Sequence, residues 1–333
     1  MYHDDLSCIG CFIVTISLML APMEGVIDHT MRAMLTRDND YERCVTEFLR
    51  VTDRLLPERV FFAICPELKQ GGTTPSETPV YLQILGSDPQ VVALNAKRAA
   101  ELGALGIDLN FGCPAKTVNR SRGGASLLRT PQLVKDIVRA ARDAVPGHIP
   151  VTAKIRLGYD HDEGLLELIE QLDQAQPTEI TIHARTKAQG YRPPAHWHKI
   201  AEARRQTSIP IIANGEIWST EDALACSEAS GCQRLMIARG ALMRPELGRL
   251  IHQRCQGLPE TPLNWSEIAH RLCLYFEQQG LHYDAKYTPS PVKQWLVYLK
   301  HYHAPAARLF EELKRITDPH HFGEALWAHY RST

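Results

Sequence analysis

The sequence has almost no net charge, so its overall charge does not indicate a particular class of binding partner. Its 333 residues include 37 Lys and Arg against 38 Asp and Glu, which leaves a formal charge of −1 at pH 7. A protein that binds nucleic acid through overall charge is strongly basic. The one asymmetry is in residues 244–333, which carry 11 Lys and Arg against 9 Asp and Glu and hold 8 of the 15 His. This weak basic excess does not by itself indicate a nucleic-acid partner.

The sequence also lacks an apolar run long enough to cross a membrane. The stretch from Cys8 to Ala21 has only 14 residues, whereas a helical span needs about 20. Asp4 and Asp5 precede it without any Lys or Arg, which is the wrong charge for a secretory signal. We therefore expect a cytoplasmic protein with no membrane partner. We interpret residues 1–17 as an N-terminal extension, with Met19 as an alternative initiator.

The sequence also lacks the regularly spaced cysteines of a disulfide framework or of a zinc site. The nine Cys are odd in number and scattered along the chain, which favours free thiols in a reducing compartment over a disulfide framework. Cys8 and Cys11 form a lone C-x-x-C without a second pair or a following His pair. We therefore predict no metal site.

The sequence also lacks the glycine-rich fingerprint of a dinucleotide-binding fold. The turn after the first predicted strand reads Ala21-Pro22-Met23-Glu24-Gly25 instead. This disfavours a doubly wound sheet. Strand-like apolar runs instead alternate with helical stretches, which predicts an α/β protein with a (β/α)8 TIM barrel. The predicted strands are 18–21, 44–48, 79–85, 106–110, 151–155, 178–182, 209–213 and 234–238. Among the predicted helices are 90–103, 131–145 and 220–230.

The alternation of predicted strands and helices stops near residue 257. The segment Gly257-Leu258-Pro259-Glu260-Thr261-Pro262 is typical of a linker. Helical stretches follow near 265–280, 289–302, 304–316 and 319–330, with no convincing strand. We therefore predict a barrel domain over 18–256 and a small helical domain over 257–333.

Polar or ionisable side chains follow all eight predicted strands. In a barrel the active site lies at the C-terminal ends of the strands. The loops after strands seven and eight carry Gly215 and Gly240 ahead of helices, and such loops favour a bound phosphate. Arg239 could add a charge-assisted hydrogen bond. Ordinary turn glycines are the alternative.

Three further side chains suit an active site, although each has a structural alternative. Lys154 would lie in the barrel mouth, where an ammonium needs an anionic partner such as a reduced flavin ring; the alternative is a lysine that reaches water. His183, one strand away, could flank the same ring or be a satisfied barrel residue. Cys113 lies in a loop between Gly112 and Pro114, where a thiol could act as a general acid or nucleophile, although single cysteines are usually inert.

Seven motifs together resemble the tRNA-dihydrouridine synthases, and they occur in family order over roughly 18–255. They are Leu20-Ala21-Pro22-Met23-Glu24-Gly25-Val26, Asn110-Phe111-Gly112-Cys113-Pro114-Ala115-Lys116, Gly123-Gly124-Ala125, Lys154-Ile155-Arg156, His183-Ala184-Arg185-Thr186, Asn214-Gly215-Glu216-Ile217 and Arg239-Gly240-Ala241. Cys44-Val45-Thr46-Glu47-Phe48, Trp218 and the helical tail are most similar to the bacterial C-type members, which are associated with uridine 16 of the D-loop.

The resemblance implies FMN as cofactor, NADPH as electron donor and reduction of the uracil C5–C6 double bond. It implies Cys113 as the catalytic acid and Asn110 between flavin and base. The residues matched to cofactor binding are Pro22, Met23, Glu24, Gln83, Asn110, Lys154, His183, Asn214, Gly215, Glu216, Ala238, Arg239 and Gly240. Two positions depart from the pattern: Ala238 stands where Gly is expected, and Arg122 lies beside Gly123-Gly124.

The target base must leave its stack to reach a barrel mouth, and a single-stranded loop base is the easiest to extract. We expect the enzyme to be a monomer with tRNA as its partner. The candidate tRNA contacts are Lys116, Arg120, Arg122, Arg185, Lys187 and Arg192, and a solvated charged rim is the alternative for each. Two other functions remain open: a flavin-dependent barrel dehydrogenase that acts on a free pyrimidine or other small molecule, and a non-catalytic tRNA-binding protein.

Overall fold

A closed barrel of eight parallel strands, in the order β1 to β8, forms the larger part of the protein. The computed structural model describes residues 15–333. Its strands are β1 (Ser17–Leu20), β2 (Tyr41–Arg50), β3 (Val80–Leu85), β4 (Ile107–Asn110), β5 (Val151–Arg156), β6 (Glu179–His183), β7 (Ile211–Asn214) and β8 (Arg234–Ile237). The predicted (β/α)8 fold is confirmed. Most of the predicted extension, with Cys8 and Cys11, lies outside the described residues.

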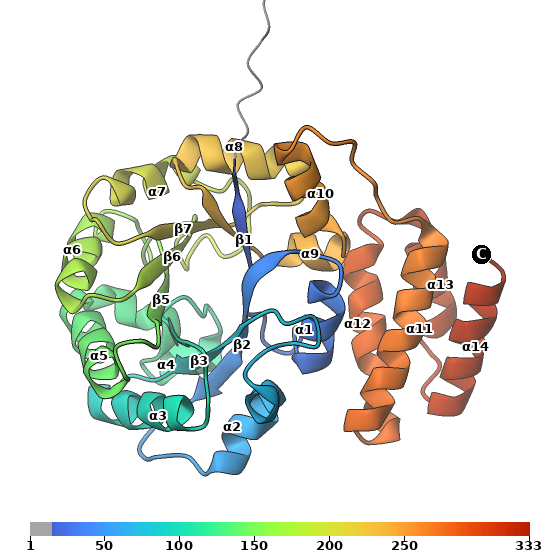
Figure 1. Ribbon diagram of the computed structural model, residues 1–333, viewed down its shortest axis with the longest axis horizontal. Coiled ribbons are helices and arrows are strands. Elements are labelled where there is room, and N and C mark those ends of the chain that lie inside the picture. Colours follow the sequence, from blue (N-terminus) through green and yellow to red (C-terminus); the bar gives the residue numbers. More distant parts are fainter. Residues whose placement is uncertain (1–14) are drawn as a thin grey trace, which may run out of the picture.

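Helices surround the barrel and follow its strands (Figure 1). They are α1 (His29–Thr36), α2 (Glu58–Ile64), α3 (Pro89–Glu101), α4 (Lys116–Arg120), α5 (Pro131–Ala144), α6 (Leu165–Ala175), α7 (Trp197–Arg204), α8 (Thr220–Ser230), α9 (Arg239–Met243) and α10 (Leu247–Cys255), with short 3-10 turns at Pro66–Gln70 and Gly124–Arg129. Their boundaries follow local signals. Helix α8, for example, begins with a capping box in which Ser219 and Asp222 exchange side-chain and backbone hydrogen bonds.

Strand β2 covers residues 41–50, whereas the sequence pattern predicts 44–48. The predicted strand begins too late because Glu42 and Arg43 are charged. Arg43 is only 3 % exposed, and it forms a buried ion pair with Glu179 of β6. The same Glu179 also pairs with Arg234 of β8. These charged groups close one end of the barrel, and a local reading of hydrophobicity therefore misses that Glu42 and Arg43 belong to a strand.

Two apolar layers stabilise the barrel. Leu18 and Leu20 of β1 belong to the large core between strands and helices, whereas Met19 packs inside the barrel with Val45, Ile212 and Met236. Alternate residues of a strand point to opposite faces, so one strand contributes to both layers.

Residues from Trp265 onward form helices only, as predicted, and lie beside α1 and α9 (Figure 1). They are α11 (Trp265–His282), the 3-10 turn η3 (Ala285–Tyr287), α12 (Pro289–Leu299), α13 (Ala304–Leu313) and α14 (Pro319–Arg331). Trp295 of α12 is fully buried, and its indole Nε1 donates a hydrogen bond to the carbonyl of Leu242 in α9 at 3.0 Å. The division at residue 257 into two domains stays a prediction. No helix within 15–333 has the length and apolar character to cross a membrane.

Candidate active site

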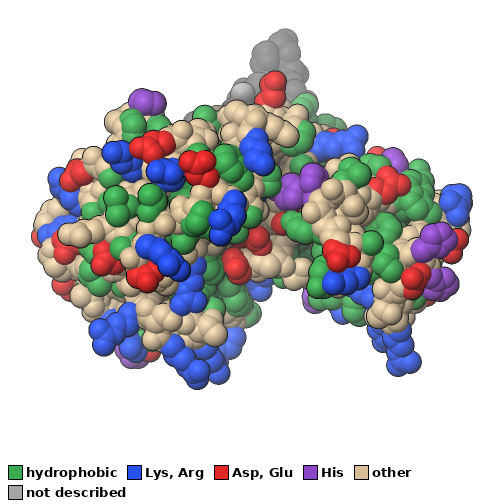
Figure 2. Space-filling view, turned by 90° about the horizontal axis from the view of Figure 1, so that it is seen from below, with side chains coloured by type: hydrophobic (Ala, Val, Ile, Leu, Met, Phe, Trp, Pro, Cys, Tyr) green, Lys and Arg blue, Asp and Glu red, His purple; other side chains and the backbone are tan. Residues whose placement is uncertain are grey.

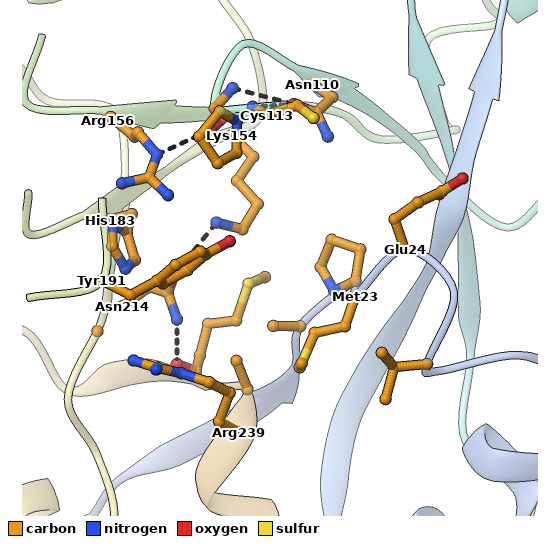
Figure 3. Close-up of a pocket in the computed structure, with 18 of the residues that line it drawn as sticks. Met23, Glu24, Asn110, Cys113, Lys154, Arg156, His183, Tyr191, Asn214 and Arg239 are labelled. Atoms are coloured by element: carbon orange, nitrogen blue, oxygen red, sulfur yellow. Dashed lines mark hydrogen bonds between the residues drawn. The ribbon is translucent and has the colours of Figure 1, made fainter. Parts of the chain in front are cut away.

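A cavity of about 760 Å³ opens at the C-terminal ends of the barrel strands. Every residue predicted to bind the cofactor lines it, and so do Cys113 and Lys116. In Figure 3, Met23 and Glu24 lie across the cavity from Arg156 and His183. The barrel topology explains the convergence, because eight parallel strands place eight loops around one mouth.

Lys154 contributes a cation to the wall of the cavity. Its ammonium Nζ donates to Asn214 Oδ1 at 3.1 Å, and Asn214 Nδ2 in turn donates to the Met236 carbonyl at 2.7 Å. Burial, assisted by the charge of Arg156, lowers the pKa of Lys154 to about 8. An ammonium held in this way still gains from a bound anion.

A chain of buried hydrogen bonds runs from the barrel interior to the catalytic loop. Asp108, which is 1 % exposed, accepts from Thr152 Oγ1 at 2.5 Å and from Gln83 Nε2 at 2.6 Å. Gln83 Oε1 accepts from Asn110 Nδ2 at 2.7 Å. Because a carboxylate only accepts, it fixes which end of the Gln83 amide faces Asn110.

The same chain ends on the backbone of the loop that carries Cys113. Asn110 Oδ1 accepts from the amides of Gly112 and Cys113, at 3.0 and 2.9 Å. The thiol of Cys113 is partly buried at the cavity wall, and this burial raises its pKa. Cys113 is therefore a protonated thiol at neutral pH, held in place by its own main chain.

His183 lies beside Lys154 and is neutral at pH 7, because burial and the nearby Arg156 cation lower its pKa well below the ordinary range. Its Nδ1 atom is buried and has no partner within residues 15–333. Gly215 lies against this ring: a Cβ there would be at an ordinary contact distance of 3.4 Å from the imidazole, but its φ of +119° disfavours any side chain. Gly215 therefore lets the loop after β7 pack against His183.

Arg239 lies at the cavity edge and is the first residue of α9, which follows β8 almost directly. Its guanidinium donates to Glu216 Oε1 at 3.2 Å and lies over the rings of Trp218 and Tyr191, 4.6 and 4.9 Å from their centroids. At Gly240 a Cβ would come within 2.1 Å of the Ile217 carbonyl. Only glycine therefore allows the loops after β7 and β8 to meet so closely.

Ala238, the predicted departure from the family pattern, does not adopt a positive φ. Its φ is −117° and its ψ is −104°, a combination that lies outside the main α and β regions. Arg122, the second departure, has a positive φ of 56°, a conformation uncommon for a residue with a side chain. The Arg122 side chain is exposed.

The candidate tRNA contacts divide into two groups. Lys116, Arg120, Arg122 and Arg192 are exposed, and Lys187 is half-buried with its ammonium over the Tyr159 ring. Arg185 is a correction. Its side chain is fully buried and pairs with Glu216 at 2.8 Å, so it supports the loop after β7 and is not available to an RNA backbone.

Several residues of the cavity wall were given no site role from the sequence, among them Arg156, Tyr191, Trp218 and Tyr298. Arg156 follows a predicted strand end, which was a usable signal. Tyr298 lies on α12, and nothing in its local sequence indicates that the helical part reaches the barrel cavity. Among residues 15–333, no group of three His, Cys, Asp or Glu side chains is arranged to hold a metal ion.

Solved structures with a similar architecture support the barrel fold. A 2-naphthoyl-CoA reductase matches with a TM-score of 0.56 at 13 % identity, over 75 % of this chain and 51 % of that one. Histamine dehydrogenase from Rhizobium sp. 4-9 matches with a TM-score of 0.54 at 14 % identity, over 78 % of this chain and 48 % of that one. At such low identity the likeness concerns the fold alone.

Several proteins share a much larger part of their sequence with this chain than these solved structures do. The tRNA-dihydrouridine(16) synthase of Vibrio cholerae is 50 % identical over 301 residues, which cover 90 % of this chain and 92 % of the relative. The protein of the same name from Pseudomonas putida is 46 % identical over 90 % of this chain and 93 % of the relative. The family described as dihydrouridine synthase (Dus) matches residues 19–331. This chain therefore belongs to the dihydrouridine synthase family.

Proposed function

We propose that this protein reduces the C5–C6 double bond of uridine 16 in the D-loop of tRNA to 5,6-dihydrouridine, with FMN as cofactor and NADPH as electron donor. Relatives named for that uridine share about half of the sequence along nearly the whole chain. The observation that carries the proposal is the placement of the Cys113 thiol on the wall of the same cavity as Lys154, Asn110 and Gln83.

The residues of the cavity fit a flavin. Within residues 15–333, His183 Nδ1 has no hydrogen-bond partner, and the Lys154 ammonium donates only to Asn214. A flavin ring carries polar edge atoms that could form further hydrogen bonds with both groups. Arg239 and the closely packed loops at Gly215 and Gly240 suit a phosphate. Lys154, His183, Asn214 and Gln83 would hold the ring, and Arg239 with the two loops would hold the phosphate.

A bound flavin supplies a hydride for C6 of the uracil, and the chain must then supply a proton at C5. Cys113 can donate it, because burial raises the pKa of its thiol and keeps it protonated near pH 7. Asn110 forms hydrogen bonds with Gln83 and with the backbone of the Cys113 loop. It therefore holds the Cys113 thiol in a fixed position at the cavity wall.

The substrate has to enter as an unpaired base, and an RNA loop meets that requirement at the lowest cost. We propose that phosphates of the tRNA contact Lys116, Arg120, Arg122, Lys187 and Arg192 around the cavity. We further propose that the protein acts in the cytoplasm as a monomer, without a metal ion, and that the C-terminal helices orient the tRNA.

The decisive experiment maps dihydrouridine in tRNA from cells that lack this protein and from the same cells after its re-expression. Loss and return of the modification at position 16 alone is the expected result. A purified protein that turns over free pyrimidines and leaves tRNA unchanged would instead indicate the small-molecule dehydrogenase. A colourless protein that binds tRNA without reducing it would indicate the non-catalytic binder.

A further inference from the structure

A second, smaller cavity of about 220 Å³ adjoins the catalytic cavity. Val26 and Glu47 line both. One wall belongs to the barrel, from the loop between β1 and α1, and the other belongs to the C-terminal helices α11 and α12. The remaining lining residues are Gly25, Asp28, Tyr275, Gln279, Tyr283, Tyr287, Pro291 and Gln294.

Asp28 is already engaged and holds the two walls together. It caps α1 by accepting from the Met31 amide at 2.8 Å, and it also accepts from Thr30 on the same helix. Its second oxygen accepts from Gln279 Nε2 at 3.0 Å and from the Tyr283 hydroxyl at 3.2 Å. These hydrogen bonds join the loop between β1 and α1 to the end of α11, so they hold the two walls of the cavity in a fixed arrangement.

Other polar groups of the cavity retain hydrogen-bonding capacity. Glu47 accepts from the Val26 amide at 3.1 Å, and a carboxylate can accept several more hydrogen bonds. Within residues 15–333, neither the Gln294 amide nor the Tyr287 hydroxyl has a hydrogen-bond partner, and both residues are exposed. The cavity therefore offers an acceptor, an amide and a hydroxyl to a ligand.

Two of the three tyrosines that line the cavity are exposed, whereas Tyr275 is buried. Tyr283 is 41 % exposed and Tyr287 is 59 % exposed; Tyr283 precedes the short turn η3, and Tyr287 is its last residue. Exposed tyrosines at the edge of a cavity provide stacking surfaces for unpaired bases, which proteins use whatever the base.

Charge decides which part of a nucleotide this cavity accepts. Asp28 and Glu47 line it, Glu24 belongs to the same loop, and no Lys or Arg is among its lining residues. Acidic side chains show where the barrel meets the C-terminal helices (Figure 2). Carboxylates repel phosphate and accept hydrogen bonds from base N–H groups. The cavity thus favours a base edge over the RNA backbone.

We propose that this cavity binds a second unpaired base of the tRNA, the immediate neighbour of the target uridine, while that uridine occupies the catalytic cavity. The inference rests on the proposed function, because only an RNA substrate supplies a neighbouring base. The shared wall at Val26 and Glu47 brings the two sites within reach of adjacent nucleotides. The neighbour stacks on Tyr287, the more exposed of the two tyrosines, and presents N–H groups to Glu47, and this second contact helps to select which uridine is reduced.

The test uses the full-length holoenzyme and two tRNAs, each with 2-aminopurine on one side of the target uridine. Stacking quenches 2-aminopurine, so fluorescence should fall on binding in at least one of them. Tyr287→Ala should remove the quenching and weaken tRNA affinity by about 5- to 150-fold, the worth of one stacked base. Gln294→Ala should weaken affinity less. Tyr302→Ala is the matched control, because Tyr302 is 50 % exposed and lines neither cavity.

Two results would overturn the inference while leaving the proposed function standing. One is that neither tRNA is quenched although its target uridine is reduced. The other is that Tyr287→Ala and Tyr302→Ala bind tRNA equally well. If the parent enzyme reduces no uridine in unlabelled tRNA, the proposed function fails instead, and the inference fails with it.

Discussion

The Lys154 ammonium donates a hydrogen bond to the side-chain carbonyl of Asn214, at 3.1 Å, across the base of the cavity. This contact joins β5 to β7 and fixes the cation where the strands converge. Asn214 is itself held by the Met236 carbonyl, so the lysine cannot swing away without breaking a chain of bonds.

Replacing Lys154 by Met should lower the midpoint potential of the bound flavin. The cation favours the anionic reduced ring, and a hydrogen bond to a charged group contributes roughly 1.5–3 kcal/mol. For a two-electron couple this corresponds to a shift of about 30–60 mV to more negative values. Spectroelectrochemical titration of both proteins measures it. Equal potentials would show that Lys154 does not contact the ring.

The same lysine should make stability depend on pH in the flavin-free protein. Its pKa is about 8 in the folded state, below the ordinary value of 10.5. Below pH 8 the folded state therefore carries the full cost of a buried cation. Between pH 8 and 10.5 only the unfolded chain binds the proton, so the cost disappears as pH rises. Urea unfolding should show Lys154→Met more stable than the parent at pH 7, with the gap closing above pH 8.

Cys113→Ala should separate the two halves of the reaction. The variant should keep its flavin, and NADPH should bleach it at close to the parent rate, since that step needs no proton at uracil C5. Reoxidation by tRNA should slow by about 10²–10⁴, the usual worth of a positioned acid. Cys113→Ser should restore only part, because a hydroxyl is a weaker acid. Stopped-flow absorbance resolves both steps, and reoxidation by tRNA at the parent rate would assign the proton to another group.

Asp108 should act on the reaction through Gln83 and Asn110. In Asp108→Leu, the Gln83 amide loses the acceptor that sets its orientation, and the Cys113 loop loses its fixed support. We expect reoxidation by tRNA to slow about 5- to 150-fold, equivalent to roughly 1–3 kcal/mol for an unmet hydrogen bond. Asp108→Asn should retain most activity, because its carbonyl can still accept from Gln83. Near-equal loss in both variants would indicate a role for the charge itself.

The exposed arginines beside the cavity should control the salt dependence of tRNA binding. Arg120→Gln should reduce the slope of log affinity against log salt by about one if Arg120 contacts one phosphate. Lys97→Gln is the matched control, since Lys97 is equally exposed but lies on α3 outside the barrel. Filter binding over a range of salt concentrations measures both slopes. Identical slopes for the two variants would remove Arg120 from the contact surface.

The sequence by itself determined the barrel and the residues around its mouth. Strands buried on both faces leave continuous apolar runs, and the polar residue that ends each run faces the active-site end. Lys154, Asn214 and Arg239 were therefore identifiable from local pattern, whereas the family resemblance indicated Pro22 and Gln83. Their meeting in one cavity follows from the closed topology.

Only the tertiary structure decided the contacts between distant segments. Arg185 looked like a surface cation, yet it is buried against Glu216. Tyr298 reaches the cavity because Trp295 anchors α12 on α9, and the second cavity exists because Asp28 binds Gln279. Helical periodicity shows which face of a helix is apolar. It does not say against which distant segment that face packs, because the partner is chosen by shape and hydrogen bonding in three dimensions.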